Sequence, residues 1–120
     1  MPRPRPGRAA RLTIHLTGGS LWHHRPAYAE LVHRARQEHV SGASVFHAVA
    51  GFGTDGHLHQ DRPVRIAGKS PCSVVFVDQE DRLRCFLLRI GDILDAVGAL
   101  AVLDHVTVHH TAAERGRRRG

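Results

Sequence analysis

A glycine-rich run is the first feature of this chain whose residue types and spacing fit a chemistry. Gly51, Gly53 and Gly56 match the pattern G-x-G-x-x-G, in which backbone N–H groups can approach a phosphate closely. A dinucleotide fingerprint needs this pattern after the first strand and at the start of a helix. Here it follows the second expected strand and leads into a polar segment without helical periodicity. A Rossmann site is therefore excluded, and a phosphate-binding bend or a plain turn remains.

Two histidines follow the glycines and fit metal chemistry. His57 and His59 would lie on one side of an extended chain, and paired imidazoles suit Zn²⁺ or Cu²⁺. No cysteine lies nearby, and Asp55 and Asp61 are the only adjacent carboxylates. Further ligands would have to come from another subunit. We favour the plainer interpretation, in which histidine replaces arginine and lysine in a chain of biased composition that has eleven histidines.

Catalytic patterns give little support for an enzyme. The chain has no H-E-x-x-H or Walker A motif and no local Ser-His-Asp or Cys-His arrangement. Cys72 and Cys85 have apolar neighbours and no C-x-x-C spacing, which predicts buried thiols in a reducing, cytoplasmic setting. No apolar run approaches the roughly 18 residues of a transmembrane helix. We predict a protein that is neither an enzyme nor inserted in a membrane.

The net charge of +6 lies in the two ends of the chain. Residues 1–11 carry four arginines and no acid, and residues 111–120 carry four arginines and one glutamate. Residues 12–110 hold nine basic against ten acidic residues. Basic tails of this kind are typically disordered and solubilising, so the charge gives no strong indication of a nucleic-acid partner. We expect tails at 1–10 and 111–120 around one folded domain at 11–110.

The elements that must position these residues follow from periodicity. Strict alternation predicts a strand at 11–17, and an apolar stripe predicts a helix from Pro26 to about Gly42. Strands at 43–52 and 72–78 flank a long polar loop at 53–71. A second helix begins at an N-cap, Asp78, and ends at Gly98, and a last strand covers 102–109 with a bulge at Asp104–His105.

The order βαββαβ predicts an α+β, ferredoxin-like fold, with two helices on one face of a four-stranded antiparallel sheet. The strands at 43–52 and 72–78 are apolar on both faces, yet the helices can cover only one. The uncovered face would be a large apolar patch in water. The simplest cover is a second copy of the chain, so we predict a homo-oligomer.

The chain resembles a known family over residues 11–110. The resemblance rests on Leu12-Thr-Ile-His-Leu16, Trp22-His-His-Arg-Pro26 and Ala50-Gly-Phe-Gly53, which are similar to the PII-like family known as domain of unknown function 190. It implies a homotrimer whose sheets face its axis. It also implies that the 53–71 loop is the counterpart of the PII T-loop. The base of that loop binds adenine nucleotides between subunits, and its tip docks on target proteins, often membrane transporters.

The sequence departs from PII proteins just after the glycines. PII proteins continue with Arg-Gln-Lys-Gly, whereas this chain has Thr54-Asp55-Gly56-His57. A less charged nucleotide, a metal or a peptide partner alone therefore stay open as effectors. The resemblance implies a PII-like signalling protein that binds a small effector between subunits and docks through the loop. The alternative is a divalent-metal-binding trimer resembling divalent-cation-tolerance proteins, with His57 and His59 as ligands. The implied effector contacts are Gly51, Phe52, Gly53, Thr54, Gly56, Arg62, Arg65 and Lys69.

Overall fold

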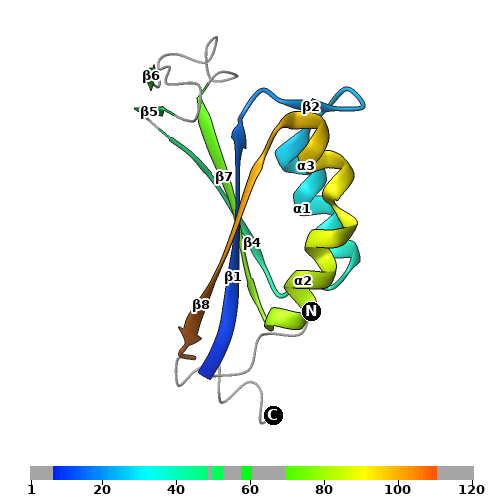
Figure 1. The fold of residues 1–120 in the computed structure, drawn as a ribbon, viewed down its shortest axis with the longest axis vertical. Coiled ribbons are helices and arrows are strands. Elements are labelled where there is room, and N and C mark those ends of the chain that lie inside the picture. Colours follow the sequence, from blue (N-terminus) through cyan, green and yellow to red (C-terminus); the bar gives the residue numbers. More distant parts are fainter. Residues whose placement is uncertain (1–6, 49, 53–57, 61–69, 111–120) are drawn as a thin grey trace.

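The computed structural model describes residues 7–48, 50–52, 58–60 and 70–110. One four-stranded antiparallel sheet has the order β4-β7-β1-β8, with β1 at Gly7–Thr17, β4 at Ala43–His47, β7 at Pro71–Asp78 and β8 at Leu100–Val108. Three helices cover one face of it (Figure 1): α1 (Ala27–Gln37), α2 (Glu80–Arg89) and α3 (Gly91–Val97). Two small ribbons pair β2 (Leu21–Trp22) with β3 (Arg25–Pro26), and β5 (Ala50–Phe52) with β6 (Leu58–Gln60). The predicted ferredoxin-like α+β fold is confirmed.

The core lies between the sheet and the helices. Alternate residues of β1 and β7 are buried, as a half-buried strand requires. Phe76 of β7 meets Phe86 of α2 edge to face, with ring centroids 5.0 Å apart. Leu31 and Ala35 bury the predicted stripe of α1. Sheet and helices therefore share one continuous apolar cluster, which fixes the helical layer on the sheet.

The first strand begins earlier than the alternation predicts. Residues 7–10 belong to β1 rather than to a disordered tail, and they pair with Val108 to His105 of β8. Ala9 and Ala10 are buried. Alanine gives only a weak hydrophobic signal, so the sequence pattern stops at Arg11. The remaining tail predictions concern residues 1–6 and 111–120, which lie outside the described residues.

Several predicted boundaries also differ from the structure. The helix α1 ends at Gln37, and His39 with φ +61° turns the chain where Gly42 was expected to do so. Pairing of β8 with β1 is continuous through Asp104 and His105, so the predicted bulge is wrong. The second helix is divided at Ile90 into α2 and α3, and Gly98 with φ +65° ends it as predicted. The second strand ends at His47, and 50–52 form a separate short strand.

Asp78 does not have the predicted role of N-cap of the second helix. Gln79, not Asp78, is the N-cap of α2, and it makes no side-chain cap bond. The Asp78 carboxylate is buried and accepts hydrogen bonds from the backbone N–H groups of Ser41 (3.0 Å) and Gln79 (2.7 Å). It thus ties the start of α2 to the chain that follows α1.

The two cysteines have different environments. Cys72 is buried, as predicted, and burial raises the pKa of its thiol. Cys85 lies on the exposed side of α2, so its predicted burial is wrong. Its neighbours Phe86 and Leu83 face the core instead. Among the described residues, no helix has the length and apolar character needed to span a membrane.

Candidate functional site

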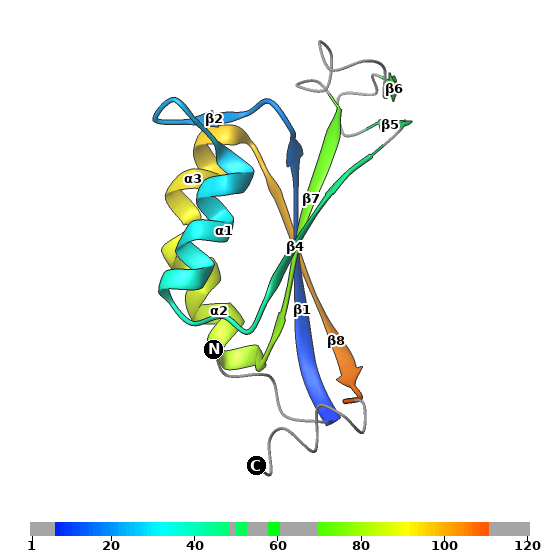
Figure 2. The same ribbon diagram turned by 180° about the vertical axis from the view of Figure 1, so that it is seen from behind.

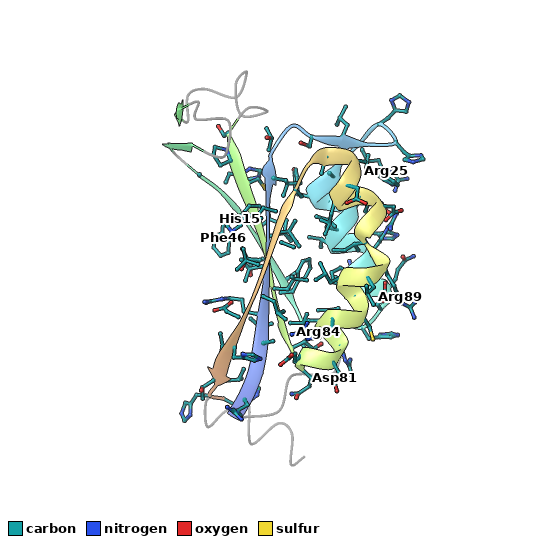
Figure 3. The ribbon with its side chains drawn as sticks, viewed as in Figure 1. His15, Arg25, Phe46, Asp81, Arg84 and Arg89 are labelled. Carbon is teal, nitrogen blue, oxygen red and sulfur yellow. The ribbon has the colours of Figure 1, made fainter. Side chains whose placement is uncertain are left out.

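The face of the sheet turned away from the helices carries no other element of the described chain (Figures 1 and 2). The strand register places Phe46, Ser73, His15 and Leu100 in one row across this face. The next row holds Ser44, Val75, Thr13 and Val102. Phe46 is 57% exposed, Leu100 56% and Val102 42%. We call this surface the open face, and Figure 3 shows His15 and Phe46 projecting from it, away from the helices.

Two polar pairs interrupt the open face. His15 Nδ1 lies 3.0 Å from the Ser73 hydroxyl. The Arg11 guanidinium donates to both carboxylate oxygens of Asp104, at 2.6 and 3.2 Å. This cross-strand pair satisfies both charges within one copy, so another apolar surface can approach without meeting an unpaired charge.

The Arg11–Asp104 pair predicts a pH effect. Hydrogen bonding from Arg11 lowers the pKa of Asp104 in the folded protein. A lowered folded pKa adds stability above the unfolded pKa, and that stability is lost as pH falls through the folded value. We expect Asp104→Asn to flatten the fall in melting temperature between about pH 5 and about pH 2. The exposed Asp95 of α3 supplies the control: if Asp95→Asn flattens the curve equally, the pair is not its cause.

The root of the long loop is held by backbone hydrogen bonds. Ala48 N–H donates to the Pro71 carbonyl and Gly18 N–H donates to the Ser70 carbonyl, both at 2.9 Å. The ring of Tyr28 meets His47 edge to face, with centroids 5.3 Å apart. Ser70 is buried, and its hydroxyl has no hydrogen-bond partner among the described residues. The ends of β1 and β4 and the starts of β7 and α1 therefore meet at this root.

The sequence-predicted site residues are only partly described. Gly51 and Phe52 belong to β5, where Gly51 pairs with His59 and Phe52 with Leu58 of β6. The structure thus brings one predicted metal ligand opposite one predicted effector contact. Within the described part of the chain, no three His, Cys, Asp or Glu side chains group together as a metal would need. Outside the described residues lie Gly53, Thr54, Gly56, His57, Arg62, Arg65 and Lys69.

The Trp22–Pro26 motif forms the β2–β3 hairpin. Its turn residues, His23 and His24, both have positive φ (48° and 69°). The Trp22 ring lies 5.7 Å from the Arg34 guanidinium, and Arg34 also pairs with Glu30 and Asp92, each at 3.1 Å. The hairpin is therefore fastened to α1 and α3 through one arginine.

A cleft of about 550 Å³ lies at the other end of the sheet. It forms where β1 and β8 extend past the first turn of α2 (Figure 1). Glu80 Oε1 lies 2.6 Å from His105 Nε2, and its second oxygen accepts from Arg84 at 2.7 Å. Hydrogen bonds from Arg84 and then from His105 lower the pKa of Glu80. The residues that line the cleft are Arg8, Ala9, Gln79, Glu80, Asp81, His105, Val106 and Thr107.

No pattern in the sequence indicates this cleft. The sequence pattern predicts that Arg8 belongs to the tail at 1–10 and that His105 belongs to a bulge. Three segments far apart in the sequence form it together, and no local spacing signals such a meeting. The one sequence signal for any part of it is the alternation of the first strand, which continues from Arg11 through Ala10 to Arg8 and so places Arg8 on the sheet.

Comparison with known proteins gives a family and a fold. The family model described as "DUF190: Uncharacterized ACR, COG1993" matches residues 9–108. A UPF0166 protein of Aquifex aeolicus (strain VF5) is 30% identical over 66 residues, which are 55% of this chain and 63% of that protein, slightly under two thirds of its length.

Two solved structures share the fold. A PII-like signaling protein from Thermus thermophilus has a TM-score of 0.66 at 16% identity, covering 93% of this chain and 95% of that one. CPII, a nitrogen regulatory PII-like protein from Thiomonas intermedia K12, was solved bound to ADP, AMP and bicarbonate. Its TM-score is 0.63 at 16% identity, and the match covers 88% of this chain and 92% of that one. These similarities show that the chain has the fold of the solved PII-like proteins. The family model shows that the chain belongs to the DUF190 family.

Proposed function

We propose that the protein is a PII-like regulator that binds an adenine nucleotide between subunits of a homotrimer and docks on a protein target through residues 53–69. One observation carries the proposal: an uncovered apolar sheet face lies beside a long segment that leaves and rejoins the sheet at one hydrogen-bonded root. The nucleotides bound to the related CPII support the choice of effector.

The open face supplies the assembly surface. Phe46, Leu100 and Val102 are large apolar side chains on one sheet surface, each about half exposed. Burying the exposed half would stabilise an assembly by about half of the roughly 1.5–3 kcal/mol that full burial of such a side chain gives. A closed ring of identical copies covers such a face on every subunit. The Arg11–Asp104 pair keeps the charges of this face satisfied within each copy.

The loop root supplies the effector site. The proposed contacts are Gly51, Phe52, Gly53, Thr54 and Gly56 from its first side, with Arg62, Arg65 and Lys69 from its second. The Ser70 hydroxyl at the root has no hydrogen-bond partner among the described residues. It is therefore a further polar group that a ligand at the root could bind. The absence of the PII glutamine and lysine from this run favours a nucleotide with few phosphates, such as AMP or a cyclic nucleotide.

Regulation would follow from an order–disorder change of the 53–69 segment. A ligand shifts such an equilibrium only when it binds one arrangement more tightly than the other. A nucleotide that touches both sides of the root would favour the arrangement in which those sides are close. The target protein, which we propose is a membrane transporter, would then bind only one arrangement of the segment. The two free cysteines fit a reducing cytoplasm.

A thermal-melt panel tests the effector. The panel holds AMP, ADP, ATP, cyclic mono- and dinucleotides, Zn²⁺ and Cu²⁺. We expect one adenine nucleotide to raise the melting temperature, because a ligand at 100 times its Kd stabilises by about 2.7 kcal/mol. Gly53→Val should abolish the shift. The matched control is Gly42→Val, because a side chain there meets only open space.

The panel also decides between the nucleotide and the metal alternative. A shift with Zn²⁺ or Cu²⁺ alone, lost in a His57→Ala/His59→Ala double variant, would replace the nucleotide proposal by metal binding. A folded protein that no nucleotide shifts would contradict the effector site.

A further inference from the structure

We propose that the cleft at the α2 end of the sheet binds a small zwitterion, namely a free α-amino acid. The site goes beyond the proposed nucleotide function, because it lies at the end of the sheet opposite β5 and β6 (Figure 1). Its volume of about 550 Å³ falls in the usual range of small-molecule sites, roughly 300–1,000 Å³. Such a ligand would give a regulator a second input.

Two opposite charges line this cleft without pairing to each other. Arg8 comes from β1 and Asp81 from the first turn of α2. Neither side chain has a hydrogen bond or ion pair in the part of the chain that the structure describes. Figure 3 shows Asp81 beside Arg84 at the end of the helical layer. The guanidinium and the carboxylate are therefore both available to a ligand.

The other charges of the cleft are already satisfied. Glu80 accepts from Arg84 and contacts His105, so its carboxylate is neutralised within the protein. A simple anion would meet Arg8 but also the Asp81 carboxylate. A simple cation would meet Asp81 but also the Arg8 guanidinium. Only a ligand that carries both charges satisfies both side chains.

An α-amino acid has the groups that these residues recognise. Its carboxylate can accept paired hydrogen bonds from the Arg8 guanidinium, and its ammonium can donate to Asp81. The hydroxyl of Thr107, which the register places on the same side of the sheet as Arg8, adds a neutral polar group to the wall. Asp81 also favours the start of α2 through the helix dipole, but that role does not account for Arg8.

Titration calorimetry on the full 120-residue protein tests the ligand class. Each of the common amino acids is titrated in turn, and for any that binds, its N-acetyl derivative and its amide follow. We expect at least one amino acid to bind, and both derivatives to lose at least about tenfold in affinity, because each lacks one of the two charges. Failure of every amino acid to bind overturns the proposal, and so does equal binding of either derivative.

Matched variants test the residues. Asp81→Asn and Arg8→Gln should each weaken binding by at least about tenfold. The controls Asp95→Asn and Arg36→Gln remove the same charges from exposed positions on α3 and α1 and should bind as the parent does. Parent-like binding by Asp81→Asn overturns the proposal. The nucleotide panel with Gly53→Val reports on the other end of the sheet, so failure of either site leaves the other test intact.

Discussion

Replacing Phe46 by aspartate is expected to separate the protein into monomers. Phe46 is 57% exposed in the single chain and lies in the first row of the open face, so the change costs little within one copy. In the proposed trimer it would remove apolar burial and place an unpaired charge in the interface. We expect the dissociation constant to rise at least about a hundredfold. Light scattering coupled to size-exclusion chromatography measures the mass directly.

The β2–β3 hairpin offers a matched control for this change. Leu21 is 60% exposed, and it lies on the hairpin beside the helices rather than on the open face. Leu21→Asp should therefore leave the mass of the assembly unchanged. A Phe46→Asp protein that keeps the parent mass would show that the open face is not the contact between copies.

Replacing Phe86 by alanine is expected to remove much of the stability of the fold. Phe86 is 1% exposed, and its ring packs edge to face on Phe76 between α2 and β7. Truncating a buried phenylalanine usually lowers the free energy of unfolding by about 3–5 kcal/mol. Domains of this kind have only about 5–15 kcal/mol in total. Equilibrium unfolding in urea, at one fixed protein concentration, measures the loss.

A neighbour on the same helix supplies the control. Leu88 is 83% exposed on α2, so Leu88→Ala should change the free energy of unfolding by no more than about 0.5 kcal/mol. A Phe86→Ala loss as small as this would mean that α2 does not depend on its contact with β7.

The sheet and the helical layer could be predicted because their signals are local. Leu12, Ile14 and Leu16 alternate with polar residues, and the register places all three on the helical side. Because β7 is apolar on both sides, its outer residues Val75 and Val77 predicted an uncovered apolar face. The structure leaves that face uncovered, and on it apolar residues such as Val75 alternate with polar ones such as Thr13 and Ser44.

The errors come from residues whose role depends on a distant partner. Asp78 binds backbone N–H groups, as an N-cap would, but one of its donors is Ser41, which lies 37 residues away. Cys85 has apolar neighbours in sequence, yet its own position on α2 faces outward. No local sequence pattern indicates the contact between Asp78 and Ser41 or the outward position of Cys85.

The two candidate sites differ in how much of each could be predicted from the sequence. The loop root was located from a glycine run and from family resemblance, and Gly51 and Phe52 lie in a described strand there. The cleft needs Arg8, Asp81 and His105 together. Those residues meet where the last strand pairs with the first beside the start of α2, and no local pattern brings the three side chains together.

The pairing of the first and last strands also bears on how the chain folds. Gly7 lies opposite Val108, so β1, a central strand, lacks one of its two neighbours until β8 has been made. During synthesis, β1 would present an unpaired edge while residues 100–108 are still being made. Contacts between residues this distant in sequence slow folding. The unpaired edge of β1 makes the unfinished chain prone to aggregation. The sheet is therefore completed only once residues 100–108 have been made, and the rate of that step should set how much of the newly made protein reaches its assembled form.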